Sequence, residues 1–332
     1  MYIFDLNKLK RGDIILEKTD DETSELVRKL SKSTYSHAIL YVGAGSCLEA
    51  DDIVISFNLQ RKLVEKKEYV CVLRLKDDVA PEVMENIILN ARMNVGMLYS
   101  IDDAKGIISE KYRPGNLRRQ TCTRFVAQAF EKAGVRLVEN ANFCSPEELL
   151  KSVLLIEVND VLLEAKEKDI MYANSESLLP KQHGIIKDIL LKAREATKSD
   201  IQEINELKDF IIQNPEFDKV IADILTQSGY LDLWREEELR MPQHYDLNKF
   251  IQYYGKGVLS AAEQIMEASR PELMRYMFCH FQLMQDMKKF GHLKVVGLFT
   301  ELYENLTDFT MRRMAVAESV IGFFYNGLIE KE

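Results

Sequence analysis

Three side chains in the first half of the chain have the chemistry of a thiol enzyme: Cys122, His37 and Glu49. Acyl transfer by a thiol needs a thiolate, an imidazole that takes and returns a proton, and a polar group that orients the imidazole. Cys122 follows Thr121, a residue type that caps helix N-termini. The unpaired N–H groups and the dipole of a first helical turn lower a thiol pKa and can stabilise an oxyanion. This pattern is compatible with nucleophilic catalysis by Cys122.

His37 and Glu49 lie on two predicted strands that are joined by the tight turn Gly43-Ala44-Gly45. Such a turn is typical of an antiparallel hairpin. Side chains alternate along a strand, so Glu49 and Asp51 share one face, and cross-strand neighbours can bring a carboxylate to His37. The spacing leaves open whether Glu49 or Asp51 orients the imidazole.

Each of these residues also has an ordinary structural interpretation. Cys122 shares a helix face with an apolar set at core spacing, which by itself favours a small buried residue. His37 precedes apolar residues and fits a half-buried strand histidine, whereas Glu49 fits a solvated strand charge. Taken singly, each pattern favours the structural interpretation. The apolar set that accompanies Cys122 is Phe125, Val126, Ala129 and Phe130.

The elements that must position these residues form an α+β pattern. Helices are predicted over 21–30, 81–94 and 121–132, the last with Gly134 just beyond its end. Short alternating or β-branched segments predict strands, and the apolar run 152–163 either closes the sheet or leads outward. The strands are expected at 13–17, 37–42, 47–50, 53–57 and 69–75.

The second half has the period of helices. About seven are expected, with a start at Ser199-Asp200, and prolines at or near helix boundaries. The polar stretch 174–184 is the expected linker. We therefore expect a catalytic domain over 1–173 and an all-helical domain of unknown role over 185–332. The expected helix ends are Gly229, Gly255 and Gly291, and the prolines are Pro215, Pro242 and Pro271.

Composition restricts the function classes. The chain has 332 residues, 46% of them hydrophobic, which suits two packed domains. Its net charge is −9, which argues against general nucleic-acid binding. It has neither a membrane-length apolar run nor a recognisable secretory signal. Five irregularly spaced cysteines do not form a disulfide framework. We expect a cytoplasmic protein with reduced thiols.

Five cations surround Cys122 in an otherwise acidic chain. They indicate an anionic substrate, with Arg118 and Arg119 as the expected contacts, although a solvated loop that pairs with acidic surface would look the same. The cations are Lys111, Arg113, Arg118, Arg119 and Arg124. No HExxH, paired CxxC or phosphate-loop motif occurs, so neither a metal nor a cofactor is expected.

Five short motifs occur in a characteristic order. They are KRGDII at 10–15, YSHAILYVG at 35–43, LEA at 48–50, GMLY at 96–99 and TCTRFVAQAF at 121–130. Over roughly residues 8–150 this order resembles the permuted NlpC/P60 papain-like superfamily, specifically the YiiX/YaeF-like amidases, which are related to the lecithin–retinol acyltransferase-like enzymes. The resemblance implies a permuted papain-like domain with a small antiparallel sheet or barrel, in which the histidine strand precedes the cysteine helix.

The resemblance also implies residue roles. Cys122 would be the nucleophile, His37 the general base and acid, and Glu49 the residue that orients His37. Tyr99 matches a position that is often aromatic and would line the pocket. Gln120 and Tyr35 are further candidates, for the oxyanion hole.

Together these features predict a metal-independent cysteine hydrolase of the amidase or peptidase type. Its substrate would be a peptide such as a cell-wall fragment. The alternatives are a lipid acyltransferase or lipid hydrolase, and a catalytically inactive binding module. The Met- and aromatic-rich segments 273–287 and 309–324 fit a helical core first, and otherwise a groove for a lipid chain or protein partner, or a homodimer contact.

Overall fold

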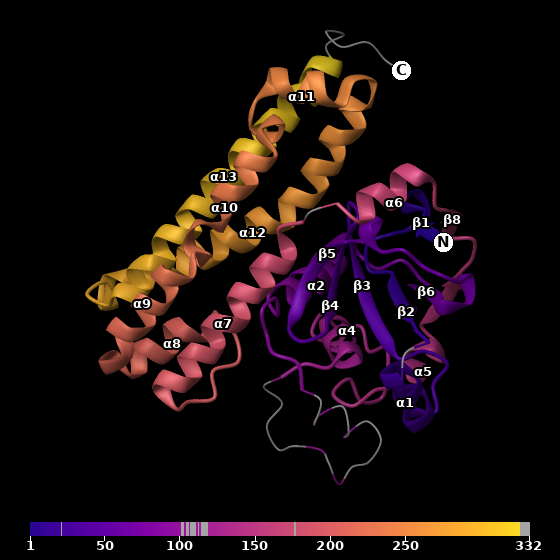
Figure 1. Cartoon of the computed structure of the whole chain (residues 1–332), viewed down its shortest axis with the longest axis horizontal. Helices are drawn as coiled ribbons and strands as arrows, with labels where there is room; N and C mark the ends of the chain where they lie inside the picture. The colour runs from indigo at the N-terminus through magenta and orange to yellow at the C-terminus, as the bar shows by residue number, and fades with distance from the viewer. Residues whose placement is uncertain are drawn as a thin grey trace. The chain divides into compact units, whose positions relative to one another are not determined.

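The computed structural model describes residues 1–20, 22–100, 103, 106, 111, 113, 119–175 and 177–325. The chain forms two compact units, Met1–Leu179 and Pro180–Glu332 (Figure 1). We refer to them as the N-terminal unit and the C-terminal unit. The Cys122, His37 and Glu49 positions all belong to the N-terminal unit.

The N-terminal unit is built on a six-stranded sheet in the order β5-β4-β3-β2-β6-β7, with every neighbouring pair antiparallel. The five predicted strands are present, and the apolar run 152–163 contributes β7 at one edge. The described strands end on β5 and β7 without closing on each other, so of the two predicted forms, a sheet or a barrel, the structure has the open sheet. The strands are β2 (Ile14–Glu17), β3 (His37–Gly43), β4 (Ser46–Ala50), β5 (Val54–Asn58), β6 (Val70–Leu75) and β7 (Leu155–Val158).

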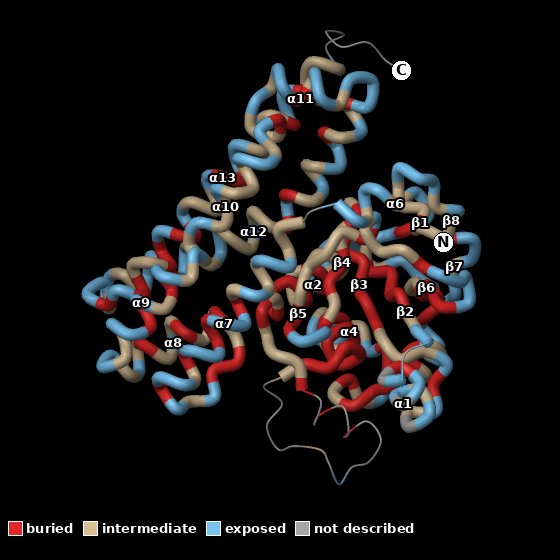
Figure 2. The backbone as a smooth tube through the Cα atoms, viewed as in Figure 1, coloured by how far each residue is buried: buried red, intermediate tan, exposed pale blue. Residues whose placement is uncertain are grey.

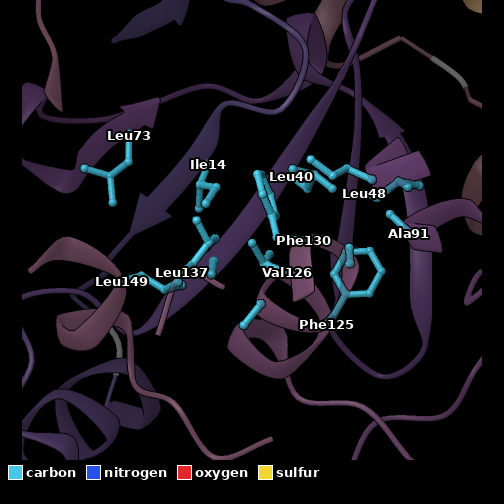
Figure 3. Close-up of a cluster of buried hydrophobic side chains, with 14 of the residues drawn as sticks. Ile14, Leu40, Leu48, Leu73, Ala91, Phe125, Val126, Phe130, Leu137 and Leu149 are labelled. Carbon is cyan, nitrogen blue, oxygen red and sulfur yellow. The ribbon is translucent and has the colours of Figure 1, made fainter. Parts of the chain in front are cut away.

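One face of this sheet is covered by helices. Here Leu40 and Leu48 of the sheet form a buried cluster with Phe125, Val126 and Phe130 of α4 (Figure 3). The contributing helices are α2 (Pro81–Arg92), α4 (Cys122–Glu131) and α5 (Pro146–Leu150). The face of α4 that the sequence marked as apolar is therefore core. Two further helices of this unit are α1 (Glu22–Ser31) and α6 (Glu167–Ala173).

The opposite face packs against a two-stranded antiparallel sheet of β1 (Tyr2–Phe4) and β8 (Leu162–Glu164), which the sequence did not predict. Phe4 of β1 belongs to the same buried cluster as Ile39 and Tyr41 of β3. Since Ala38, Leu40 and Val42 belong to the cluster on the helical side, both faces of β3 are buried, as the red strands of Figure 2 show. This double burial explains why β3 is a nearly continuous apolar run.

The C-terminal unit is all-helical, and its two longest helices run side by side as a hairpin (Figure 1). Gly229, Gly255 and Gly291 follow the ends of α9, α11 and α12, as predicted. Along the described residues, no helix has both the length and the hydrophobicity needed to cross a membrane. The helices are α7 (Leu179–Thr197), α8 (Glu206–Gln213), α9 (Asp218–Ser228), α10 (Leu233–Arg240), α11 (Leu247–Tyr254), α12 (Val258–Phe290) and α13 (Lys294–Tyr325).

Three local expectations for this half differ from the structure. α7 begins at Leu179, so the end of the expected linker is helical. No helix begins at Ser199-Asp200, and α8 starts only at Glu206. Pro271 lies inside α12 rather than at a boundary. A proline removes one helical hydrogen bond, and the packing of α12 along α13 offsets that loss.

The packing of α4 on the sheet predicts the stability of the N-terminal unit. Phe130 is fully buried, so Phe130→Ala should lower the free energy of unfolding of this unit by about 3–5 kcal/mol. Hydrogen exchange of peptides from β3 and α4 along a urea series measures this change. Val153→Ala, at an 87% exposed position, is the control and should change the free energy by less than about 0.5 kcal/mol. Equal effects of the two substitutions would contradict the assignment of this core.

Candidate active site

His37 and Glu49 are hydrogen-bonded, with 2.8 Å between His37 Nε2 and Glu49 Oε2. In the β3–β4 register Ile39 lies opposite Glu49, so Glu49 reaches His37 diagonally along the shared face. Asp51, the position that continues the register opposite His37, is exposed beyond the end of β4. Of the two carboxylates that the sequence left open, the structure places Glu49 on the imidazole.

Cys122 is the first residue of α4 and is 7% exposed. Thr121 caps this helix, because its hydroxyl accepts a hydrogen bond from the Arg124 backbone N–H at 3.4 Å. The thiol is hydrogen-bonded to His37, and the backbone N–H groups of Ala38 and Thr123 donate to the sulfur. Since Glu49 occupies Nε2, Nδ1 is the ring nitrogen left for Cys122. The structure therefore joins Cys122, His37 and Glu49 in one hydrogen-bonded series.

The electrostatics of this series favour a thiolate beside an imidazolium. Burial acts to lower the pKa of His37, but the Cys122 and Glu49 charges and hydrogen bonds raise it well above 6.5. Burial acts to raise the pKa of Cys122, but the charge and hydrogen bond of His37 and the two backbone N–H groups lower it below 9.0. The neighbouring groups thus shift both pKa values toward the ionised pair despite its burial.

The other four cysteines have thiol pKa values that are raised rather than lowered. Burial raises the pKa of each of their thiols, to about 12 for Cys71 and Cys144. For Cys47 the nearby Glu49 carboxylate adds to the effect of burial. The electrostatic environment of Cys122 is therefore distinct from that of the remaining thiols, which are Cys47, Cys71, Cys144 and Cys279.

Tyr99 lies beside Cys122. Its backbone forms a parallel bridge with Gln120, two residues before the nucleophile position, in which the Ser100 N–H donates to the Gln120 carbonyl at 2.9 Å. Burial, the Cys122 charge and the Asp51 charge all raise the pKa of Tyr99. The phenol therefore stays protonated and can act as a hydrogen-bond donor.

The structure does not direct the other two oxyanion-hole candidates at the thiol. The Gln120 side-chain amide donates to Asn94 Oδ1 at 3.2 Å and to Gln128 Oε1 at 3.1 Å, which uses both of its hydrogens. The Tyr35 hydroxyl is hydrogen-bonded with Cys71, and burial raises its pKa to about 12. Both side chains therefore interact with residues other than Cys122.

The cations near Cys122 have structural contacts. Arg124 is fully buried and donates to Asp103 Oδ2 at 2.6 Å, to the Asn142 carbonyl at 2.7 Å and to the Arg119 carbonyl at 2.9 Å. It therefore fixes the start of α4 rather than facing a substrate. Arg119 is partly buried, whereas Arg118 lies outside the described residues.

Arg113 also makes contacts within the protein. Its guanidinium lies over the Phe143 ring at 4.9 Å, and its Nε donates to the Gly106 carbonyl at 3.2 Å. The interpretation of all five cations as a substrate-facing cluster therefore does not hold for Arg113 and Arg124.

Two charged residues near the site were not predicted from the sequence. Glu17 of β2 lies directly opposite His37, and Lys62 pairs with Glu17 at 2.8 Å. Burial acts to lower the pKa of Lys62, but Glu17 and Glu49 raise it, so this lysine keeps its charge beside Glu49. The alternation of β2 could have identified Glu17, whereas Lys62 follows a short 3-10 turn and carries no such signal.

No group of three or more described His, Cys, Asp or Glu side chains is arranged to hold a metal ion. The arrangement of Cys122, His37 and Glu49 is instead suited to acyl transfer, because it provides an activated nucleophile, a proton carrier and an orienting carboxylate.

Part of this chain is similar to known proteins. Residues 8–147 match the model of the permuted papain-like amidase enzymes, YaeF/YiiX, C92 family. A solved structure described as metalloprotein yiiX from Escherichia coli O157:H7 is 17% identical, covers 46% of this chain and 97% of its own, and has a TM-score of 0.38. No curated protein matches the chain. The family match confirms the resemblance and the permuted papain-like fold for residues 8–147.

The thiolate–imidazolium pair predicts the pH dependence of Cys122 alkylation. Because the Cys122 pKa lies below 9.0, iodoacetamide should label this thiol well below that pH, and labelling should slow as pH falls through the lowered pKa. His37→Ala removes the cation but leaves the burial, so the reactive range should move to higher pH. Site-resolved mass spectrometry measures both proteins. Labelling of Cys122 no faster than that of the other four cysteines would contradict the pair.

The contact between Glu49 and His37 predicts a second change in the pH dependence of Cys122 alkylation. Glu49→Gln keeps an acceptor but removes the charge that raises the pKa of His37. The imidazolium then stabilises the thiolate less, and the Cys122 alkylation profile should move up by about one pH unit. Asp51→Asn is the matched control and should leave the profile in place. An equal shift in both variants would rule out a specific role for Glu49.

Proposed function

We propose that this chain, whose residues 8–147 match the permuted papain-like amidases of the C92 family, is a cysteine hydrolase that cleaves amide or ester bonds. The observation that carries the proposal is the hydrogen-bonded series of Cys122, His37 and Glu49, with the thiol pKa lowered and the imidazole pKa raised. A binding module that had lost catalysis would have no need to lower the pKa of a buried thiol.

In the first half of the reaction, the Cys122 thiolate attacks the carbonyl carbon of the scissile bond. The carbonyl π electrons move to oxygen, which becomes the oxyanion of a tetrahedral intermediate. As this intermediate collapses, the bond to the leaving nitrogen or oxygen breaks and His37 gives its proton to the leaving group. The products are a free amine or alcohol and a thioester on Cys122.

In the second half, neutral His37 takes a proton from water as the water oxygen attacks the thioester. The carbon–sulfur bond then breaks, which releases a carboxylic acid and restores the thiolate–imidazolium pair. Glu49 keeps Nε2 engaged in both halves, so that Nδ1 faces the sulfur and the proton is carried on one fixed nitrogen.

The start of α4 and Tyr99 would stabilise the oxyanion. The backbone N–H of Cys122 belongs to the first turn, where N–H groups have no partner within the helix. The Tyr99 phenol lies close enough to Cys122 for the thiolate to raise its pKa, and it is protonated at neutral pH. Two donors of this kind are the usual composition of an oxyanion hole.

The substrate that we propose is a peptide amide, such as a fragment of a bacterial cell wall. The family description as amidases supports an amide substrate. The alternative is acyl transfer from a lipid, which would pass through the same thioester but place a fatty acyl group on Cys122. The two substrates therefore differ in the mass of the trapped intermediate.

The trapped thioester is the test of this function. Full-length protein is incubated with a mixture of cell-wall peptides, or with phosphatidylcholine vesicles, quenched in acid and analysed by intact mass and peptide mapping. An acyl-peptide adduct on Cys122, absent in Cys122→Ala and reduced at least about 10²-fold in His37→Ala, is the expected result. A fatty acyl adduct would support the lipid alternative instead. Turnover that survives in Cys122→Ala would overturn the proposal.

A further inference from the structure

The long helix α12 carries an exposed apolar stripe. Its five members are each 46–65% exposed, and at 100° per residue they lie within about 120° of one another around the helix axis. Buried Leu283 lies on the opposite side, and buried Pro271 lies at the edge of the stripe face, one turn before Met274. The expectation that this segment is core is therefore wrong for the stripe, which consists of Met274, Met277, Phe278, Phe281 and Met284.

Charged residues extend the same face beyond both ends of the stripe. At 100° per residue, exposed Glu263 and Glu267 lie on this face before the stripe, and exposed Lys288 and Lys289 lie on it after the stripe. The face thus has an acidic end, an apolar centre and a basic end.

The spacing of these residues is the same on both sides of a centre between Met277 and Phe278. Glu267 lies ten residues before Met277, and Lys288 lies ten residues after Phe278. Met274 and Phe281 lie three residues outside the same centre. A second α12 turned by 180° about this point would place acid against base and apolar against apolar. A parallel copy would place like charges together.

We propose that α12 is the contact surface of a homodimer, in which two copies of the chain pair their α12 helices antiparallel about a two-fold axis at Met277 and Phe278. The occupant is a second copy because the face complements itself in both charge and apolar character, as an isologous interface must. Arg270, the other exposed charge on this face, falls opposite uncharged Gln285 and meets no like charge. This inference does not depend on the proposed hydrolase function.

The length of the face is sufficient for such a contact. Residues 263–289 are continuous helix, which spans about 39 Å at 1.5 Å per residue. Large exposed apolar patches on soluble proteins commonly mark interaction sites, and paired helices with a Met- and Phe-rich centre bury that surface from water.

A matched pair of substitutions tests the stripe. Met277 and Met311 of α13 are both 53% exposed. By sedimentation equilibrium of the full chain, the wild type should be a dimer, and Met277→Glu should raise the dimer Kd at least about 10²-fold because two carboxylates then meet at the axis. Met311→Glu should leave the Kd unchanged. Circular dichroism checks that both variants are folded.

Charge exchange tests the antiparallel orientation. Glu263→Lys with Glu267→Lys makes both ends basic, and Lys288→Glu with Lys289→Glu makes both ends acidic, so each double variant should raise the Kd about tenfold or more. The chain with all four substitutions should dimerise like the wild type, and the two double variants should form a heterodimer when mixed. In a parallel pair like charges already face each other in the wild type, so neither double variant would raise the Kd, and that result would contradict the antiparallel orientation.

Three results would overturn the homodimer. The first is a wild-type chain that stays monomeric at about 100 μM. The second is a dimer whose Kd is the same in Met277→Glu and Met311→Glu. The third is a monomer that Met277→Glu, but not Met311→Glu, destabilises toward urea, which would mean that the stripe is covered by another part of the same chain.

Discussion

The catalytic chemistry that we propose depends on two charges, on Cys122 and His37, that stabilise each other in a buried place where neither would be stable alone. Burial raises the pKa of the Cys122 thiol and lowers the pKa of the His37 imidazole, so burial alone would keep both groups neutral. The contact between them, with Glu49 on the far side of the ring, reverses both effects. The geometry must be held closely, because the stabilisation is lost if either partner moves out of hydrogen-bond reach.

The fold provides that precision by anchoring each partner at the end of a rigid element. His37 is the first residue of β3, whose two faces are both buried, and Cys122 is the first residue of α4, whose apolar face packs on the same sheet. Arg124 ties the beginning of α4 to Asp103 through a buried ion pair. Breaking such a pair leaves an unpaired buried charge, so it holds the helix start in place even though it does no chemistry.

The proposed active site and the α12 face use charged side chains differently. Near His37, Glu17, Lys62 and Glu49 form a partly buried series of opposite charges. The C-terminal unit presents charge and apolar side chains along the outside of α12. These are different uses of the same residue types. A buried charge must be paired within the chain, whereas an exposed self-complementary face gains its partner by association.

Local sequence patterns were enough to predict most elements of the N-terminal unit and to name the candidate residues. Alternation and turn residues gave β2 to β6, and apolar spacing with Thr121 gave α4, because these patterns depend on neighbours a few residues away. Only the three-dimensional structure shows that Glu49 rather than Asp51 contacts His37. It also shows that Gln120 and Arg124 make their hydrogen bonds away from Cys122, and that Lys62 lies near Glu49. Each of these depends on strand register or on contacts between distant segments. Local periodicity cannot encode them, since it specifies which face a side chain occupies but not what lies opposite.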